Sequence, residues 1–290
     1  MLTISQEKIK REFKQKLSKF VSELKEHIST EDDQWTIKGF IDVFKNIYTI
    51  SADTKIVSKI LEIHLFPKLL EFAHKNKFRI VLAEQQNYYP DLSFVHNNDE
   101  NIKFALDLKT TYRLPDSPEF CNGFTLGSHG EYFTNRKSNK NIQFPYEQYL
   151  GHFCLGIIYS RSASEHLDET KTYSMKQLKS ITSVISNFKF FVQEKWEIAS
   201  DYQGSSNTAN IGSITKIDDI LEGNGVFKNL GEQWFDEYWM NYGKIQMTLP
   251  DGKVKKITTL KNYLIYRGQN PELANAKANK PARKKRLITK

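Results

Sequence analysis

Asp91, Asp107 and Lys109 are the residues whose types and spacing point most directly to chemistry. Asp91 begins one strand-like run, residues 91–95, and Asp107 and Lys109 stand at the end of another, residues 103–108. The asparagine and aspartate residues between the two runs are typical of a turn. We therefore expect the runs to pair as a hairpin.

The register of this hairpin follows from the position of its turn. If the chain turns about Asp99, residues placed symmetrically about it lie opposite each other, so that Asp91 faces Asp107. Side chains alternate between the faces of a strand, and Lys109 therefore shares the face of Asp107. The other face is apolar, with Leu92 opposite Leu106, Phe94 opposite Phe104, and Leu108 beside them.

Two facing carboxylates repel each other unless one takes up a proton or a cation bridges them. Oxygen ligands on a rigid sheet suit a hard cation such as Mg²⁺. A lysine ammonium beside that cation can stabilise the negative charge that builds on a phosphate under attack, or help to orient and deprotonate the attacking water. The three residues therefore predict metal-dependent hydrolysis of a phosphodiester.

Two other interpretations of the same residues stay open at this point. An Asp-x-Lys triplet is common on solvated strands, where the charges form an exposed ion pair without a function. Two carboxylates can also act as the acid and base of a glycosidase, but the adjacent lysine lends no support to that chemistry.

The rest of the chain supplies elements around this hairpin. Apolar residues at helical spacing predict a helix over residues 4–27. A second helix should begin after Asp53 as N-cap, carry Glu62, and kink or restart at Pro67. Further predicted elements are strands at residues 78–82, 154–159 and 188–193 and helices at residues 145–152 and 232–242. The pattern is that of a mixed α+β protein.

Composition is that of a folded protein. The chain has 290 residues, 39% of them apolar, which is enough for one large core or two modest ones. It contains no apolar run long enough for a signal peptide or a membrane span, so we expect a cytoplasmic protein without a membrane partner. Cys121 and Cys154 suit neither a disulfide framework nor a thiolate metal site.

Positive charge is concentrated near the C-terminus. The net charge is +8, and residues 272–290 contribute +6 of it, from seven basic residues and Glu272. Any nucleic-acid surface in the remaining chain must therefore come from local clustering. We expect the polar and basic tail, residues 271–290, to be disordered.

Several separate segments resemble the EcoRV family of type II restriction endonucleases, within the PD-(D/E)xK nuclease superfamily. Pro90-Asp91 and Asp107-Leu108-Lys109 provide the Pro-Asp and Asp-x-Lys parts of the nuclease core. The likeness spans roughly residues 51–268, in order and with similar spacing, which makes it more specific than the nuclease motif alone. The matching segments are residues 53–55, 85–91, 105–112, 124–127, 195–196, 204–213 and 265–268.

The resemblance implies a restriction-endonuclease-like core, with a central mixed sheet flanked by helices, and a Mg²⁺ cofactor. It implies that Asp91 and Asp107 are metal ligands and that Lys109 is the catalytic lysine. Glu62 matches the position of a further acidic residue that assists metal binding in the family. The alternative for Glu62 is an ordinary helix carboxylate that points to solvent.

The resemblance also assigns two loops to DNA, residues 204–213 in the major groove and residues 85–89 near the minor groove. Asparagine can pair with the edge of adenine, and a threonine methyl can touch that of thymine. Without the resemblance, such a run of small polar residues is typical of a flexible surface loop. The predicted DNA-binding residues are Gln85, Gln86, Asn87, Gly204, Ser205, Ser206, Asn207, Thr208 and Asn210, with Lys55, Thr110, Thr111 and Tyr112 as phosphate contacts.

Some positions depart from the family's pattern. Ser206 stands where the family has a glycine, Ala209 where it has a threonine, and Tyr88 where it has a histidine. Residues 113–139 differ in length and content, which leaves their DNA contacts unassigned. The resemblance therefore does not fix the recognised sequence.

By resemblance, the expected function is that of a type II restriction endonuclease, without a small-molecule substrate. A homodimer would bind palindromic duplex DNA, by resemblance GATATC, and cut it at the centre to leave blunt ends with 5'-phosphate and 3'-hydroxyl groups. We expect residues 1–50 to form an N-terminal helix and dimerisation region, residues 51–270 the endonuclease domain, and residues 271–290 the tail. The alternatives are a sequence-specific DNA-binding protein without cleavage and a repair or recombination nuclease that recognises DNA structure.

Overall fold

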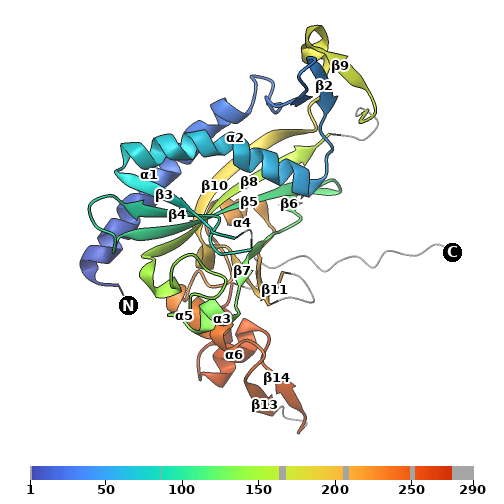
Figure 1. The fold of residues 1–290 in the computed structure, drawn as a ribbon. Helices are drawn as coiled ribbons and strands as arrows, with labels where there is room; N and C mark the ends of the chain where they lie inside the picture. The colour runs from blue at the N-terminus through green and yellow to red at the C-terminus, as the bar shows by residue number, and fades with distance from the viewer. Residues whose placement is uncertain (1, 86, 163–167, 205–208, 249–251, 276–290) are drawn as a thin grey trace, which may run out of the picture. The chain divides into compact units, whose positions relative to one another are not determined.

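The structure is a computed structural model that describes residues 2–85, 87–162, 168–204, 209–248 and 252–275 (Figure 1). The chain divides into two compact units. The first comprises Met1–Asn122 and Arg136–Gln193, and the second comprises Gly123–Asn135 and Glu194–Lys290. Across the described ranges, no helix is both long enough and apolar enough to cross a membrane.

A mixed sheet forms the centre of the first unit and confirms the expected α+β class. β3, β4 and β5 are antiparallel neighbours, whereas β5 and β8 are parallel. Along the sheet the strands run in the order β10 (Ile185–Glu194), β8 (Gly151–Arg161), β5 (Lys103–Leu114), β4 (Leu92–His96) and β3 (Phe78–Leu82), and β6 (Ser117–Cys121) also pairs with β5.

Two long helices, α1 (Ile4–Ile28) and α2 (Thr54–Lys75), cover one face of this sheet (Figure 1). Thr3 caps α1, and the Asp53 side chain accepts hydrogen bonds from the first backbone N–H groups of α2, as its sequence predicts. Both predicted helices are therefore confirmed, and their starting points follow from the capping residues.

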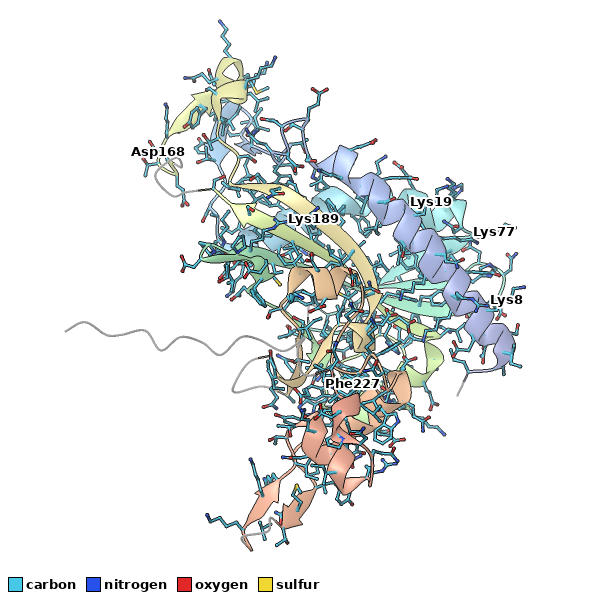
Figure 2. The ribbon with its side chains drawn as sticks, turned by 180° about the vertical axis from the view of Figure 1, so that it is seen from behind. Lys8, Lys19, Lys77, Asp168, Lys189 and Phe227 are labelled. Carbon is cyan, nitrogen blue, oxygen red and sulfur yellow. The ribbon has the colours of Figure 1, made fainter. Side chains whose placement is uncertain are left out.

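The apolar stripe of α1 packs into the core of the first unit. The ring of Phe13 stacks on that of Phe104 in β5, with 3.9 Å between the centroids. Lys8 and Lys19 lie on the exposed side of the helix (Figure 2). This division into a buried and a charged face is the one that the helical spacing predicts.

α2 continues through Pro67 to Lys75 as one helix, so the helix does not restart at Pro67. A proline removes the hydrogen bond to the carbonyl four residues earlier, which belongs to Ile63. Ile63 is 62% exposed. The helix nevertheless continues through Pro67.

The predicted helix at residues 145–152 is wrong. Only a 3-10 turn, η1 (Tyr146–Gln148), forms there, and β8 already begins at Gly151. Parallel pairing with β5 draws Gly151 and His152 into the sheet, opposite Phe104 and Ala105. A pairing with a strand so distant in sequence overrides the weak local preference for helix.

A small antiparallel sheet of the first unit carries exposed apolar side chains. It consists of β1 (Gly39–Ile41), β2 (Asn46–Thr49) and β9 (Thr172–Ser174), and the 3-10 helix η3 (Met175–Ser180) follows it. Phe40 and Ile41 on β1 are exposed, and Phe44 in the turn before β2 is 81% exposed. Exposed apolar groups gathered in one place are typical of a surface that binds a partner.

The second unit has its own core, in which Phe227 is fully buried (Figure 2). Its central sheet pairs β11 (Ala199–Gln203), β12 (Asn210–Ser213) and β7 (Thr125–Ser128). The predicted helix at residues 232–242 is confirmed as α5 (Glu232–Asn241). The other elements are α3 (Glu131–Thr134), η4 (Lys195–Glu197), α4 (Ile217–Leu221), the hairpin of β13 (Gln246–Thr248) and β14 (Val254–Lys256), α6 (Leu260–Tyr266) and η5 (Pro271–Leu273).

Candidate active site

The hairpin of β4 and β5 has the predicted register, with Leu92 opposite Leu106 and Phe94 opposite Phe104. Asp91 immediately precedes β4, and its backbone N–H points to Asp107 Oδ1 at 3.4 Å. The backbone N–H of Leu108 in turn donates to Asp91 Oδ2 at 2.7 Å. The hairpin therefore holds the two carboxylates side by side.

Lys109 completes the predicted trio. Its Nζ lies 3.3 Å from Asp107 Oδ2 and 3.7 Å from Asp91 Oδ2. Asp107 is only 3% exposed, although the Asp91 side chain is 41% exposed, so at least the contact of Lys109 with Asp107 is not the solvated ion pair of an ordinary strand face. The arrangement brings two carboxylates and one ammonium group together at the edge of a rigid sheet.

The pKa values in this cluster reflect burial and mutual charge. Burial raises the pKa of Asp91, and the charges of Asp107 and Glu62 raise it further while Lys109 lowers it. Burial alone would lower the pKa of Lys109, but the carboxylates of Asp107 and Asp91 raise it above its ordinary value. The cluster thus favours a charged lysine, and the repulsion between neighbouring carboxylates is relieved when a cation binds them.

Glu62 lies near this cluster but not within it. The Lys59 ammonium contacts Glu62 Oε1 at 2.8 Å, and Glu62 and Asp91 line a common pocket. Within the described part of the chain, no group of three or more histidine, cysteine, aspartate or glutamate side chains is placed to hold a metal ion. Two carboxylates nevertheless fit Mg²⁺, which is often bound through one or two carboxylates and otherwise keeps water or phosphate ligands.

A buried polar network on the same side of the sheet was not singled out from the sequence. The hydroxyl groups of Ser93 and Tyr149 lie 2.8 Å apart, and the Tyr89 hydroxyl lies 3.0 Å from His152 Nδ1. Burial raises the pKa of Tyr149, so this hydroxyl stays protonated. These contacts hold Tyr89 and Ser93, two residues before and two residues after Asp91. No local pattern in the sequence signals them, because they depend on the pairing of β5 with β8.

The predicted major-groove loop begins and ends on the hairpin of β11 and β12. The Gly204 N–H donates to the carbonyl of Asn210 at 2.9 Å, which closes the base of the loop. A Cβ on Gly212 would lie 2.6 Å from the Tyr202 carbonyl oxygen, so only glycine allows this close approach. Four of the predicted base-reading residues, Ser205, Ser206, Asn207 and Thr208, lie outside the described residues, as does Gln86.

The predicted phosphate contacts lie along α2 and β5 of the first unit. Lys55 is exposed in the first turn of α2, and the Thr110 hydroxyl contacts that of Ser58. The Arg161 guanidinium covers the Tyr112 ring, 3.6 Å from its centroid.

The predicted DNA-binding residues of the first unit differ in their exposure to solvent. Thr111 is buried, so its side chain does not face the solvent from which a phosphate would approach. Gln85 and Asn87, in the predicted minor-groove loop, are exposed.

Known proteins resemble this chain over most of its length. The model of the family described as restriction endonuclease EcoRV matches residues 31–268. The type II restriction enzyme EcoRV of Escherichia coli is 35% identical over 249 residues, which cover 86% of this chain and 98% of that protein. The chain belongs to the EcoRV family of restriction endonucleases and is a type II restriction endonuclease, a hydrolase of DNA.

Proposed function

We propose that this protein hydrolyses duplex DNA at a palindromic site in a Mg²⁺-dependent reaction centred on Asp91, Asp107 and Lys109. The observation that carries the proposal is the convergence of Lys109 Nζ, 3.3 Å from Asp107 Oδ2 and 3.7 Å from Asp91 Oδ2, on one edge of the sheet. Two hard oxygen ligands beside one ammonium group suit a phosphodiester and its counter-ion.

Asp91 and Asp107 would hold the Mg²⁺ ion, with Glu62 as a carboxylate near enough to assist. A bound Mg²⁺ would supply positive charge that offsets the negative charge of the phosphate in the transition state. Asp107 is nearly buried and Leu108 orients Asp91 by a backbone hydrogen bond. The ligands are therefore held in place before the substrate binds, which is the condition for effective electrostatic catalysis.

Lys109 would act as a fixed cation on the phosphate. Its ammonium is held between two carboxylates, and this pairing favours the charged form over the neutral amine that a general base requires. Of the two roles that the sequence allows, charge stabilisation and deprotonation of water, the geometry supports the first. The ammonium can donate a hydrogen bond to a non-bridging phosphate oxygen.

Sequence recognition would come from the loop on β11 and β12. We propose GATATC as the site, cut at its centre to leave blunt ends, because the segment at residues 204–213 resembles the reader of the family. A symmetric site calls for a two-fold homodimer. The exposed apolar residues Phe40, Ile41 and Phe44 lie within the predicted dimerisation region, residues 1–50, and support a subunit contact there. Such an enzyme would meet its DNA in the cytoplasm.

The test is cleavage of a plasmid that carries one GATATC site, with Mg²⁺ and with EDTA. We expect linear DNA with blunt ends only when Mg²⁺ is present, and light scattering after size exclusion should give the mass of a dimer. Binding without Mg²⁺-dependent cleavage would favour the DNA-binding alternative. Cut ends without a shared sequence would favour a nuclease that recognises DNA structure.

A further inference from the structure

His129 meets both ends of the predicted major-groove loop. It directly follows β7, and its backbone N–H donates to the carbonyl of Ala209 at 2.7 Å. On the other side of the loop, the amide Nε2 of Gln203 lies 3.3 Å from His129 Nε2. Gln203 is the last residue of β11, and Ala209 directly precedes β12. The backbone and the side chain of one residue therefore join the two strands at the base of the loop.

Aromatic side chains at the C-terminal end of α5 hold the His129 ring in place. The centroid of this ring lies 5.2 Å from that of Trp239 and 5.4 Å from that of Tyr242. Trp239 is fully buried, and its ring stacks on that of Tyr242 with 4.8 Å between the centroids. An imidazole packed against two stacked rings has little freedom to rotate, so it offers Gln203 a fixed partner.

The protonation state of His129 suits this contact. Burial lowers the pKa of His129, and the positive charge of Lys244 lowers it further. The neutral ring is therefore favoured near neutral pH, and a neutral imidazole has one nitrogen that accepts a hydrogen bond. The Gln203 amide can then donate to His129 Nε2.

We propose that the hydrogen bond between Gln203 and His129 positions the loop at residues 204–213 and thereby sets how well the enzyme distinguishes its recognition site from related sequences. The inference rests on the proposed function, in which this loop reads the bases. His129 acts through Gln203, which directly precedes the loop, and is therefore a positioning residue.

Loss of this contact should affect the correct site more than other sequences. Hydrogen bonds to base edges form in full only at the correct sequence and need accurate placement of the loop. Phosphate contacts form with every sequence, and those predicted from the sequence belong to α2 and β5 of the first unit. A loop that is released at its base must be ordered again whenever it reads a site, which costs free energy.

The experiment begins with Gln203→Met, which removes the amide and keeps the length of the side chain. The substrates are duplexes that carry GATATC, or whichever site the wild type cuts fastest, and the same duplexes with one base pair changed. We expect the ratio of kcat/KM between the correct and the altered sites to fall by about 3- to 10-fold, as for the loss of one hydrogen bond. The affinity for a duplex without the site, measured by anisotropy with EDTA, should not change.

His129→Phe keeps a ring against α5 but has no nitrogen that accepts from Gln203. If the two residues act through one hydrogen bond, the double variant should lose no more discrimination than either single variant. Gln233→Met is the matched control, because it removes the same type of amide, which donates to Glu237 at 3.0 Å within α5. It should leave the ratio unchanged. Thermal melts followed by circular dichroism confirm that each variant is folded.

The outcomes separate this inference from the function on which it rests. If the wild type selects a site and Gln203→Met changes the ratio by less than about 3-fold, the hydrogen bond does not position the loop. Additive losses in the double variant, or an equal loss of affinity for DNA without the site, would also overturn the inference. If the wild type cuts no DNA, or cuts it without a sequence preference, the proposed function itself fails and the inference falls with it.

Discussion

Asp107 is the most deeply buried charged group of the candidate centre, and its position depends on Lys109. The ammonium lies 3.3 Å from Asp107 Oδ2, in surroundings where an unpaired charge would be costly. The Lys109 ammonium therefore offsets the cost of burying the Asp107 carboxylate, and burial raises the pKa of the neighbouring Asp91.

Asp107→Asn should abolish cleavage while the protein stays folded. The amide keeps the shape of the side chain but loses the negative charge that would hold the proposed metal, so we expect cleavage to fall by more than about 1,000-fold. Initial rates on the plasmid substrate, with circular dichroism to monitor folding, would measure both effects. Asp99→Asn makes the same change in the exposed turn of the same hairpin and should leave the rate unchanged; full activity of Asp107→Asn would refute the metal assignment.

His64 makes the stability of the first unit sensitive to pH. The Trp35 indole N–H points to His64 Nδ1 at 3.4 Å, an interaction that requires the neutral ring. Burial, with the charge of His27, lowers the pKa of His64 to about 4. Because the unfolded chain then binds more protons than the folded one between about pH 6.5 and about pH 4, stability must fall as pH decreases through this window.

His64→Gln should flatten that dependence. Glutamine keeps an acceptor for Trp35 but does not titrate. Between pH 6.5 and pH 4 we expect the free energy of unfolding of the wild type to fall by about 1 kcal/mol more than that of the variant, or its Tm by about 2–4 °C more. This value is discounted because His64 is only partly buried. Thermal melts across this range would measure it, with His74→Gln, an exposed histidine of the same helix, as the control. Parallel curves for wild type and His64→Gln would exclude this role.

At the scale of elements, α1 is an integral part of the core although the family match begins only at residue 31. Phe13 on α1 contacts five rings of α2 and the central sheet, those of Phe72, Phe78, Phe94, Phe104 and Phe153. Aromatic contacts of this kind contribute free energy beyond the area they bury. The helix therefore stabilises the hairpin that carries Asp107.

Phe13→Ala should lower the free energy of unfolding by about 3–5 kcal/mol, because it leaves a cavity among these rings. Urea denaturation followed by fluorescence would measure the loss. Ile4→Ala, an exposed position at the start of the same helix, should change stability by less than about 0.5 kcal/mol. If Phe13→Ala lowered the free energy of unfolding by as little as Ile4→Ala, α1 would contribute little to the stability of the sheet.

The elements that could be predicted from the sequence are those whose signals are local. The turn around Asp99 fixed the hairpin register, and the Asp53 cap fixed the start of α2, because each depends on neighbours in the chain. The helix predicted at residues 145–152 does not form, and no local pattern indicates the contact of Tyr89 with His152. Both depend on the pairing of β5 with β8, which joins residues more than forty apart.

At the scale of the whole molecule, charge is distributed unevenly along the chain. Residues 276–290 lie outside the described structure and beyond the family match, and they hold seven basic and no acidic residues. When lysine and arginine side chains bind DNA phosphates, counter-ions are released into solution. The affinity for DNA therefore depends on the salt concentration but not on the DNA sequence. Residues 276–290 should therefore raise the affinity of the protein for any DNA duplex and contribute little to the choice of site.

Removal of residues 276–290 should weaken binding of nonspecific duplex at low salt and flatten its salt dependence. If all seven charges contact phosphates, the slope of log affinity against log salt changes by about 6, and fewer contacts give proportionally less. Fluorescence anisotropy with EDTA present measures binding without cleavage. A full-length chain with these seven residues replaced by glutamine separates charge from length and should behave like the truncated protein. Equal slopes for all three proteins would mean that the tail does not contact DNA, and the modest positive charge of the remaining chain would then have to supply every phosphate contact.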